Sequence, residues 1–266
     1  MKIRRLAVAG VAVFAAAGLL AGCGAKKGND VAASPTAKAS PSPTLALAPK
    51  DALLASTKSL ATTSYKFTIK SDSLNGSGTA DPVKKAVTLQ AVGQESGASI
   101  KLDFIGIAPD LYAKVDLGGL NSQLGISTDK YLHIDSTRLG ANPSLPIGID
   151  GDPANVAGVL AGLNDVKTSD GKTFTGTVDA TKMTGDRVPD SDAVRKAGDK
   201  AKAIPFTAVL DDQGRLTDLK VDGASIDPQL AFEATFAGFG SVATIAKPDA
   251  AQVVEAPDAV IQLFKS

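Results

Sequence analysis

Apolar and polar residues alternate with a period of two through much of this chain of 266 residues. At the first clear instance, Tyr65, Phe67 and Ile69 alternate with serine, lysine and threonine. Successive side chains of a strand point to opposite faces of a sheet, so this alternation predicts an antiparallel strand with one buried face. The same alternation predicts further strands at Val87/Leu89/Ala91, Ile100/Leu102/Phe104, Leu111/Ala113/Val115, Leu132/Ile134, Phe174/Gly176/Val178 and Leu230/Phe232/Ala234/Phe236.

Turn-forming residues separate the predicted strands. In the first half, which we expect to be a meander, the predicted turns are Asn75-Gly76, Asp81-Pro82 and Pro109-Asp110. In the second half, residues 206–210 and 216–221 flank a segment in which Gly214 can adopt a positive φ, so a hairpin is expected there. The Gly-Phe-Gly sequence at residues 238–240 is expected to bend the chain after the last of these strands.

Other segments carry helical signals. Residues 51–60 follow a proline and have apolar residues at helical spacing. Residues 152–163 begin with Asp-Pro-Ala-Asn, a helix-start signal, and continue into an apolar stretch that predicts a short packing helix. A polar helix is expected within residues 190–203, closed by Pro205, and a short final helix at residues 257–264. Strands and helices together predict an α+β fold.

The N-terminus has a different pattern. Lys2, Arg4 and Arg5 precede an apolar run over residues 6–20, and the single cysteine of the chain, Cys23, follows closely. A basic segment, a short apolar run and small residues are the parts of an export signal. The sequence Leu-Ala-Gly-Cys that ends at Cys23 resembles a bacterial lipobox, which implies cleavage before the cysteine and attachment of acyl chains to it. The alternative is an ordinary secretory signal that leaves a free thiol.

Residues 24–49 are rich in alanine, serine, threonine, proline and lysine and have no apolar periodicity, which indicates a flexible tether. We therefore expect a signal peptide over residues 1–22, a lipidated cysteine and tether over residues 23–49, and one folded domain over residues 50–266. No second long apolar run follows the cysteine. The predicted location is the extracytoplasmic face of the cell membrane, reached through a lipid anchor.

Charge and cysteine content narrow the functional classes. The chain has 28 Lys and Arg against 28 Asp and Glu, and removal of residues 1–22 leaves 25 against 28, a net charge of −3. Nucleic-acid binding proteins usually carry a basic footprint, which is missing here, so no nucleic-acid partner is expected. A single cysteine cannot form an internal disulfide, so the stability of the folded domain has to come from burial.

His133 is the only histidine, so a Ser-His-Asp triad would depend on it. It lies in a predicted strand, on the same face as Tyr131 and Asp135 and opposite Leu132 and Ile134. We expect a solvent-facing side chain or one at the rim of the sheet.

Other signs of catalysis are weak. The tetrads Ser127–Lys130 and Ser169–Lys172 have the Ser-x-x-Lys spacing of serine acylating enzymes, but neither companion motif, Ser-Asp-Asn or Lys-Thr-Gly, occurs. The acidic residues Asp150, Asp152 and Asp179 lack the spacing of a calcium loop and are expected to be solvated. The sequence therefore predicts neither an enzyme nor a metal or cofactor site.

Short motifs resemble the LppX/LprG/LprA/LprF family of envelope lipoproteins of high-GC Gram-positive bacteria. The matching features are the lipobox, Tyr-Lys-Phe-Thr at residues 65–68 after the leading helix, Asp-Leu-Tyr-Ala at 110–113, Asp-Pro-Ala-Asn-Val-Ala-Gly-Val-Leu-Ala at 152–161, the strand after Pro205 with its Gly214 hairpin, and Gly-Ser-Val at 240–242. Members often carry a tryptophan after the tyrosine-containing strand, where this chain has Lys-Tyr-Leu-His.

The resemblance implies a LolA-like half-barrel, a curved antiparallel sheet with a few helices covering its concave face. It also implies an apolar cavity that binds acylated lipids or glycolipids, with an export transporter as a candidate partner. The cavity would be lined by the apolar face of the strands, and among its candidates Phe67, Phe104, Phe232 and Phe236 stand out because large flat side chains suit alkyl chains. The full set of candidates is Tyr65, Phe67, Ile69, Leu89, Ile100, Leu102, Phe104, Leu111, Val115, Phe174, Phe206, Phe232 and Phe236.

Taken singly, each of these residues is more often part of an ordinary core. A second hypothesis therefore stays open, in which the chain is a tethered protein-interaction or sensor module with a closed core and no lipid cargo.

Overall fold

The computed structural model describes residues 47–72, 74–95, 98–140, 152–185 and 189–263. The chain divides into two units, Met1–Thr44 and Leu45–Ser266, and every described residue belongs to the second. The predicted signal peptide, Cys23 and the tether up to residue 46 lie outside the described residues, and so does Asp150. The predicted division of the chain at residues 23 and 50 stays a prediction.

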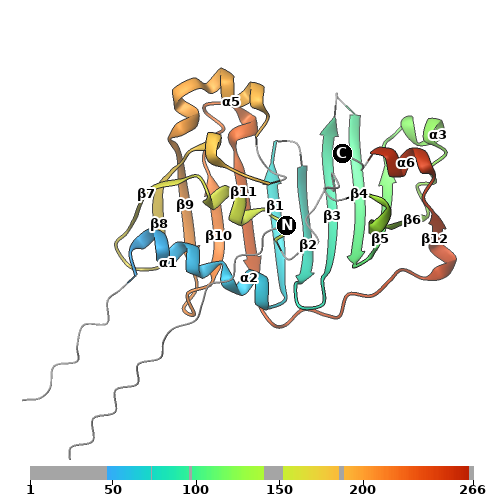
Figure 1. Cartoon of the computed structure of the whole chain (residues 1–266), viewed down its shortest axis with the longest axis horizontal. Helices are drawn as coiled ribbons and strands as arrows, with labels where there is room; N and C mark the ends of the chain where they lie inside the picture. Colours follow the sequence, from blue (N-terminus) through green and yellow to red (C-terminus); the bar gives the residue numbers. More distant parts are fainter. Residues whose placement is uncertain (1–46, 73, 96–97, 141–151, 186–188, 264–266) are drawn as a thin grey trace, which may run out of the picture. The chain divides into compact units, whose positions relative to one another are not determined.

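An open sheet of twelve strands forms the framework of the second unit (Figure 1). The order across the sheet is β12-β6-β5-β4-β3-β2-β1-β11-β10-β9-β8-β7, and every pair is antiparallel except β12 with β6. The strands are β1 (Tyr65–Ser71), β2 (Leu74–Asp81), β3 (Ala86–Glu95), β4 (Ala98–Ile107), β5 (Asp110–Asp116), β6 (Tyr131–Asp135), β7 (Leu163–Thr168), β8 (Thr173–Val178), β9 (Ile204–Leu210), β10 (Leu216–Val221), β11 (Phe232–Ala237) and β12 (Val253–Glu255).

Two meanders, β1–β6 and β7–β11, join side by side where β1 pairs with β11. In this register Phe67 lies opposite Phe236 on one side and opposite Gly78 on the other. The row continues through Leu89 to Phe104, so apolar side chains from one face of β1, β3, β4 and β11 line up across the sheet. The α+β class and the mostly antiparallel, curved, open sheet were correctly predicted.

Burial alternates along the strands as the sequence pattern predicted. In β1 the side chains of Tyr65, Phe67 and Ile69 are buried while the intervening Lys66 is exposed. The sheet therefore has an apolar face, which carries the core, and a polar face. The predicted turn at residues 211–215 is confirmed, with Gly214 at φ 72°, and so is the bend after β11, with Gly238 at φ 63°.

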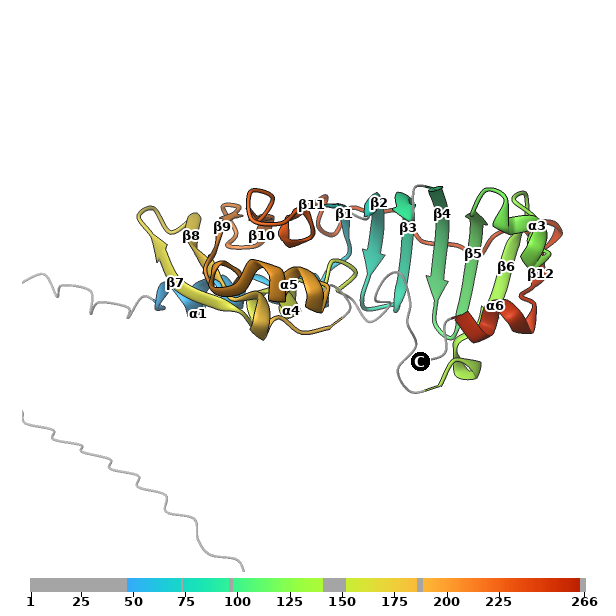
Figure 2. The same cartoon turned by 90° about the horizontal axis from the view of Figure 1, so that it is seen from above.

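Short helices pack on the apolar face, where Leu53, Leu60 and Val159 belong to the same buried cluster as Tyr65 and Phe67. Figure 2 shows α1, α4, α5 and α6 on one side of the sheet. The helices are α1 (Pro49–Ser56), α2 (Lys58–Thr62), α3 (Leu120–Leu124), α4 (Val156–Leu160), α5 (Ser191–Ala197) and α6 (Asp258–Leu263).

The predicted helix starts are confirmed. The carboxylate of Asp152 accepts hydrogen bonds from the backbone N–H groups of Val156 (2.8 Å) and Ala157 (2.9 Å) at the beginning of α4. Asp190 caps α5 in the same manner. The prediction that Pro205 closes this helix is wrong, because the helical turns end at Lys202 and Pro205 lies within β9.

The predicted turn at Asn75-Gly76 is also wrong, because both residues lie inside β2. After Leu74, the apolar face of β2 is made of small residues, so the strand lacks the apolar alternation that identified the others. A Cβ atom at residue 78 would lie 1.8 Å from the carbonyl oxygen of Thr88 and 2.9 Å from Cζ of Phe67. Glycine is therefore required in β2 by the close approach of its neighbours and not by a turn.

Candidate functional site

The apolar face gathers the predicted cavity residues. Most of them are at most 8% exposed and belong to one buried cluster: Tyr65, Phe67, Ile69, Leu89, Phe104, Leu111, Phe174, Phe206, Phe232 and Phe236. Leu102 and Val115 are half-buried against the same cluster. Ile100 is half-buried as well but lies outside the cluster formed by the described residues. The described residues thus place all the candidates except Ile100 in or against one continuous apolar cluster.

Tyr65 lies at the centre of the aromatic part of this cluster. Its ring meets Phe67 at 6.4 Å and Phe236 at 5.7 Å between centroids, both edge-to-face, and Phe239 at 5.9 Å. Such edge-to-face pairs are favourable because the positive ring edge meets a negative ring face. Burial, with a smaller contribution from the negative charge of Asp152, raises the pKa of the Tyr65 hydroxyl well above its usual value. Tyr65 is therefore neutral at physiological pH.

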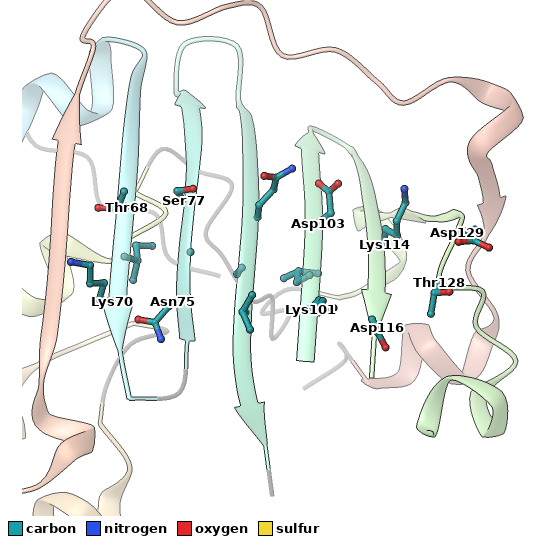
Figure 3. Close-up of a pocket in the computed structure, with 16 residues that line it drawn as sticks. Thr68, Lys70, Asn75, Ser77, Lys101, Asp103, Lys114, Asp116, Thr128 and Asp129 are labelled. Carbon is teal, nitrogen blue, oxygen red and sulfur yellow. The ribbon is translucent and has the colours of Figure 1, made fainter. Parts of the chain in front are cut away.

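The polar face carries a groove of about 700 Å³ over β1–β5 (Figure 3). Small-molecule sites have volumes of roughly 300–1,000 Å³, so this groove is of suitable size. The polar side chains that line it, here called the polar groove, come from alternate positions of these strands and from the loop before β6: Thr68, Lys70, Asn75, Ser77, Gln90, Lys101, Asp103, Lys114, Asp116, Thr128 and Asp129. Its lysines and aspartates balance, so it has no net charge.

A second pocket of about 530 Å³ continues from the polar groove and shares Thr68, Ser77, Gln90 and Asp103 with it. Where the two meet, the Tyr131 hydroxyl donates to Oδ2 of Asp103 at 2.8 Å, and Nζ of Lys114 lies 4.5 Å from the Tyr131 ring centroid. Burial and this carboxylate raise the pKa of Tyr131 to about 12. The tyrosine ring is therefore fixed between a neighbouring anion and a neighbouring cation.

Sequence reasoning did not identify the polar groove. Its residues occupy the polar positions of amphipathic strands, which are normally exposed to solvent. Asn75 is the clearest example, because its pairing with Gly76 indicated a turn. The strand order that brings β2 between β1 and β3 is the information that the pattern lacked.

His133 lies on β6, with a side chain that is 22% exposed. Its Nε2 is 2.8 Å from Oδ1 of Asp110 and its Nδ1 is 2.8 Å from Oε1 of Glu255. The ring stacks on Tyr112 at 5.2 Å between centroids. Lys247 donates to the other oxygen of Asp110 at 2.6 Å. The histidine is thus at the rim of the sheet but bonded on both sides. Sequence spacing could not reveal this cluster, because Lys247 and Glu255 lie more than 100 residues from the other members.

In the Ser-x-x-Lys tetrads, both lysines are bonded to groups other than the serine, so neither is placed to act as its base. Lys130 donates to the carbonyl oxygen of Ala251 at 2.6 Å, and Lys172 pairs with Asp212 at 2.5 Å. The segment from Ser169 is a turn, with Gly171 at φ 71°. Of the other acids, Asp179 is 5% exposed and caps a short 3-10 helix, so the expectation that it is solvated is wrong.

Within the described part of the chain, no group of three or more His, Cys, Asp or Glu side chains is placed to hold a metal ion. No helix among the described residues is long and apolar enough to cross a membrane.

The structure therefore offers two candidate surfaces, the apolar layer beneath the helices and the polar groove. No protein-family model matches the chain, and no curated protein matches it at a significant level.

Proposed function

We propose that the chain is a membrane-anchored lipoprotein that binds the acyl chains of lipids or glycolipids between the apolar face of its sheet and its helices. The observation that carries this proposal is the extent of the apolar face, which runs without interruption from β8 through β11 and β1 to β6. In this proposal the sheet is a LolA-like half-barrel, and the anchor is Cys23. The cargo would be passed on through the envelope, with an export transporter as the partner.

The helices that cover the apolar face are suited to making room for a bound acyl chain. The helices are short, from five to eight residues, and helices of this length have little stability of their own. They stay in place through side chains such as Leu53 and Val159, which pack on the sheet. A bound acyl chain would replace these contacts with its own, and each buried methylene contributes about 0.8 kcal/mol. Displacement of short helices by lipid is therefore energetically feasible.

Mass spectrometry of lipids extracted from the purified full chain tests the proposal. We expect diacyl or triacyl lipids to accompany the wild-type protein. Leu89→Asp places a charge on the apolar face and should abolish the lipid signal, whereas Gln90→Asp, the next residue on the opposite face of β3, should leave it unchanged. Circular dichroism identifies variants that do not fold.

Ala91→Leu is a second variant, since it adds volume on the same apolar face without adding charge. It should lower the amount of bound lipid while the protein remains folded. If wild-type protein carries no lipid, or Leu89→Asp and Gln90→Asp carry equal amounts, the proposal is wrong.

The polar groove favours a second candidate function, a tethered interaction module with a closed core. Its balanced charges suit a polar ligand without net charge. Ser77→Arg would place a large side chain in the groove where it meets the second pocket. Cross-linking of the full chain in its envelope should then lose a specific partner, while the lipids extracted from the protein stay the same.

A further inference from the structure

The C-terminal segment, residues 238–263, connects the two halves of the sheet. It leaves β11, passes along the strand ends to the far edge, adds β12 beside β6, and ends with α6 on the helix side (Figures 1 and 2). Val260 and Ile261 of α6 are 4% and 1% exposed and belong to the buried cluster. The segment therefore closes one edge of the apolar layer.

The backbone attachment of this segment is slight. β12 pairs with β6 over three residues only, and two further backbone hydrogen bonds join the segment to the body, from the Ala256 N–H to the His133 carbonyl at 3.0 Å and from the Gly240 N–H to the Ser64 carbonyl at 2.8 Å. Short parallel pairings of this kind contribute little by themselves. Side-chain links between the segment and the body must therefore matter for its position.

Several of these links converge on His133, while others, such as the bond from Lys130 to the carbonyl oxygen of Ala251, lie apart from it. One ring nitrogen faces Asp110 of β5 and the other faces Glu255 of β12, while Lys247 of the same C-terminal segment binds Asp110. Tyr112 stacks against the ring, and Asp135 is the nearest acid on β6 itself. His133 is thus the bridge between the body and the C-terminal edge strand.

We propose that His133 is a pH-sensitive latch, which holds β12 and α6 on the sheet when its imidazole is protonated and loosens them when it is neutral. A protonated imidazole has two N–H donors and satisfies both carboxylates, whereas a neutral ring has only one. Asp110 retains Lys247 after His133 loses its proton. Glu255, whose side chain is 74% exposed, has no other cation bonded to it among the described residues, so its link to the body is the one that weakens.

The direction of the pH effect follows from the same contacts. Asp110 raises the pKa of His133 most, burial opposes this, and Glu255 raises it further, so the net shift is upward. The pKa of His133 is thus higher in the folded protein than in the unfolded chain. The protonated latch therefore stabilises the folded protein fully at pH values below the unfolded pKa. This stabilisation is lost as the pH rises through the folded pKa. The latch is therefore closed at acidic pH and loosened at alkaline pH. It does not require that the protein binds lipid.

Hydrogen–deuterium exchange of the full chain tests the latch, with rates corrected for the intrinsic effect of pH. Between about pH 5 and about pH 9, protection of peptides covering β12 and α6 should fall roughly two- to fivefold. Peptides from β8 and β9, at the other end of the sheet, should show no such step and report whether the protein is folded. A wild-type protein without the step in β12 and α6 would overturn the proposal.

Variants separate the latch from simple packing. His133→Gln should remove the pH step. Arg138→Gln is the matched control, because it removes only the 3.0 Å pair between Arg138 and Asp258 of α6 and should lower protection equally at every pH. If His133→Gln fails to fold, Glu255→Gln tests the latch instead, because an exposed glutamate is readily replaced. This variant should also remove the pH step. A pH step that persists unchanged in a folded His133→Gln or Glu255→Gln protein would contradict the latch.

Discussion

At the scale of single residues, a side chain is buried either because it is apolar or because hydrogen bonds satisfy its polar atoms. Tyr65, Phe67 and Leu89 lie in the core as their alternation indicates. Asp179, by contrast, is a buried cap and not a solvated acid. Its role depends on the Thr181 backbone N–H, which donates to it at 3.0 Å, and hydrogen bonds of this kind are not encoded in a polarity pattern.

Gly78 gives a prediction at this scale. Gly78→Ala places a methyl group against the Thr88 carbonyl oxygen, and overpacking of this kind typically costs about 1–3 kcal/mol. Gly119→Ala is the matched control, because no atom lies within 4 Å of its added methyl group and its φ is not positive. Urea denaturation should show a lower free energy of unfolding for Gly78→Ala only. Equal stability of the two variants would mean that β2 does not approach β3 as closely as described.

At the scale of elements, long amphipathic strands were predictable and short or irregular ones were not. β3, β4 and β5 have the alternation that identifies a half-buried strand. β12 has only three residues, and β7 is interrupted by a register shift between Asn164 and Lys167, so neither gives a period-two signal. β2 was missed because glycines occupy its apolar face.

The start of α4 gives a prediction at the scale of elements. Asp152→Ala removes two hydrogen bonds from the first turn of a helix of five residues and should lower the free energy of unfolding by about 0.5–2 kcal/mol. Asp249→Ala is the control, because Asp249 caps an exposed 3-10 turn and its loss should have a smaller effect. Thermal denaturation of both variants checks this, and an Asp249→Ala protein that is the less stable of the two would refute the assigned role of Asp152.

At the scale of the whole molecule, the described sheet is organised by a pairing that no local pattern contains. β1 and β11 lie more than 160 residues apart in the chain, yet Phe67 faces Phe236 across them. This pairing makes one apolar face out of two meanders, and the proposed lipid binding depends on the width of that face. The His133 cluster likewise exists only after β12 has been placed beside β6, whereas the polar groove needs only the consecutive strands β1–β5.

The central claim is that acyl chains occupy the apolar face. Photo-cross-linking of the full chain with a lipid that carries a photoreactive group on its acyl chain tests it directly, with the modified peptides identified by mass spectrometry. The proposal predicts labels on β1, β4 and β11, at or beside Phe67, Phe104, Phe232 and Phe236. Labels confined to the polar groove, or no specific labels at all, would contradict it.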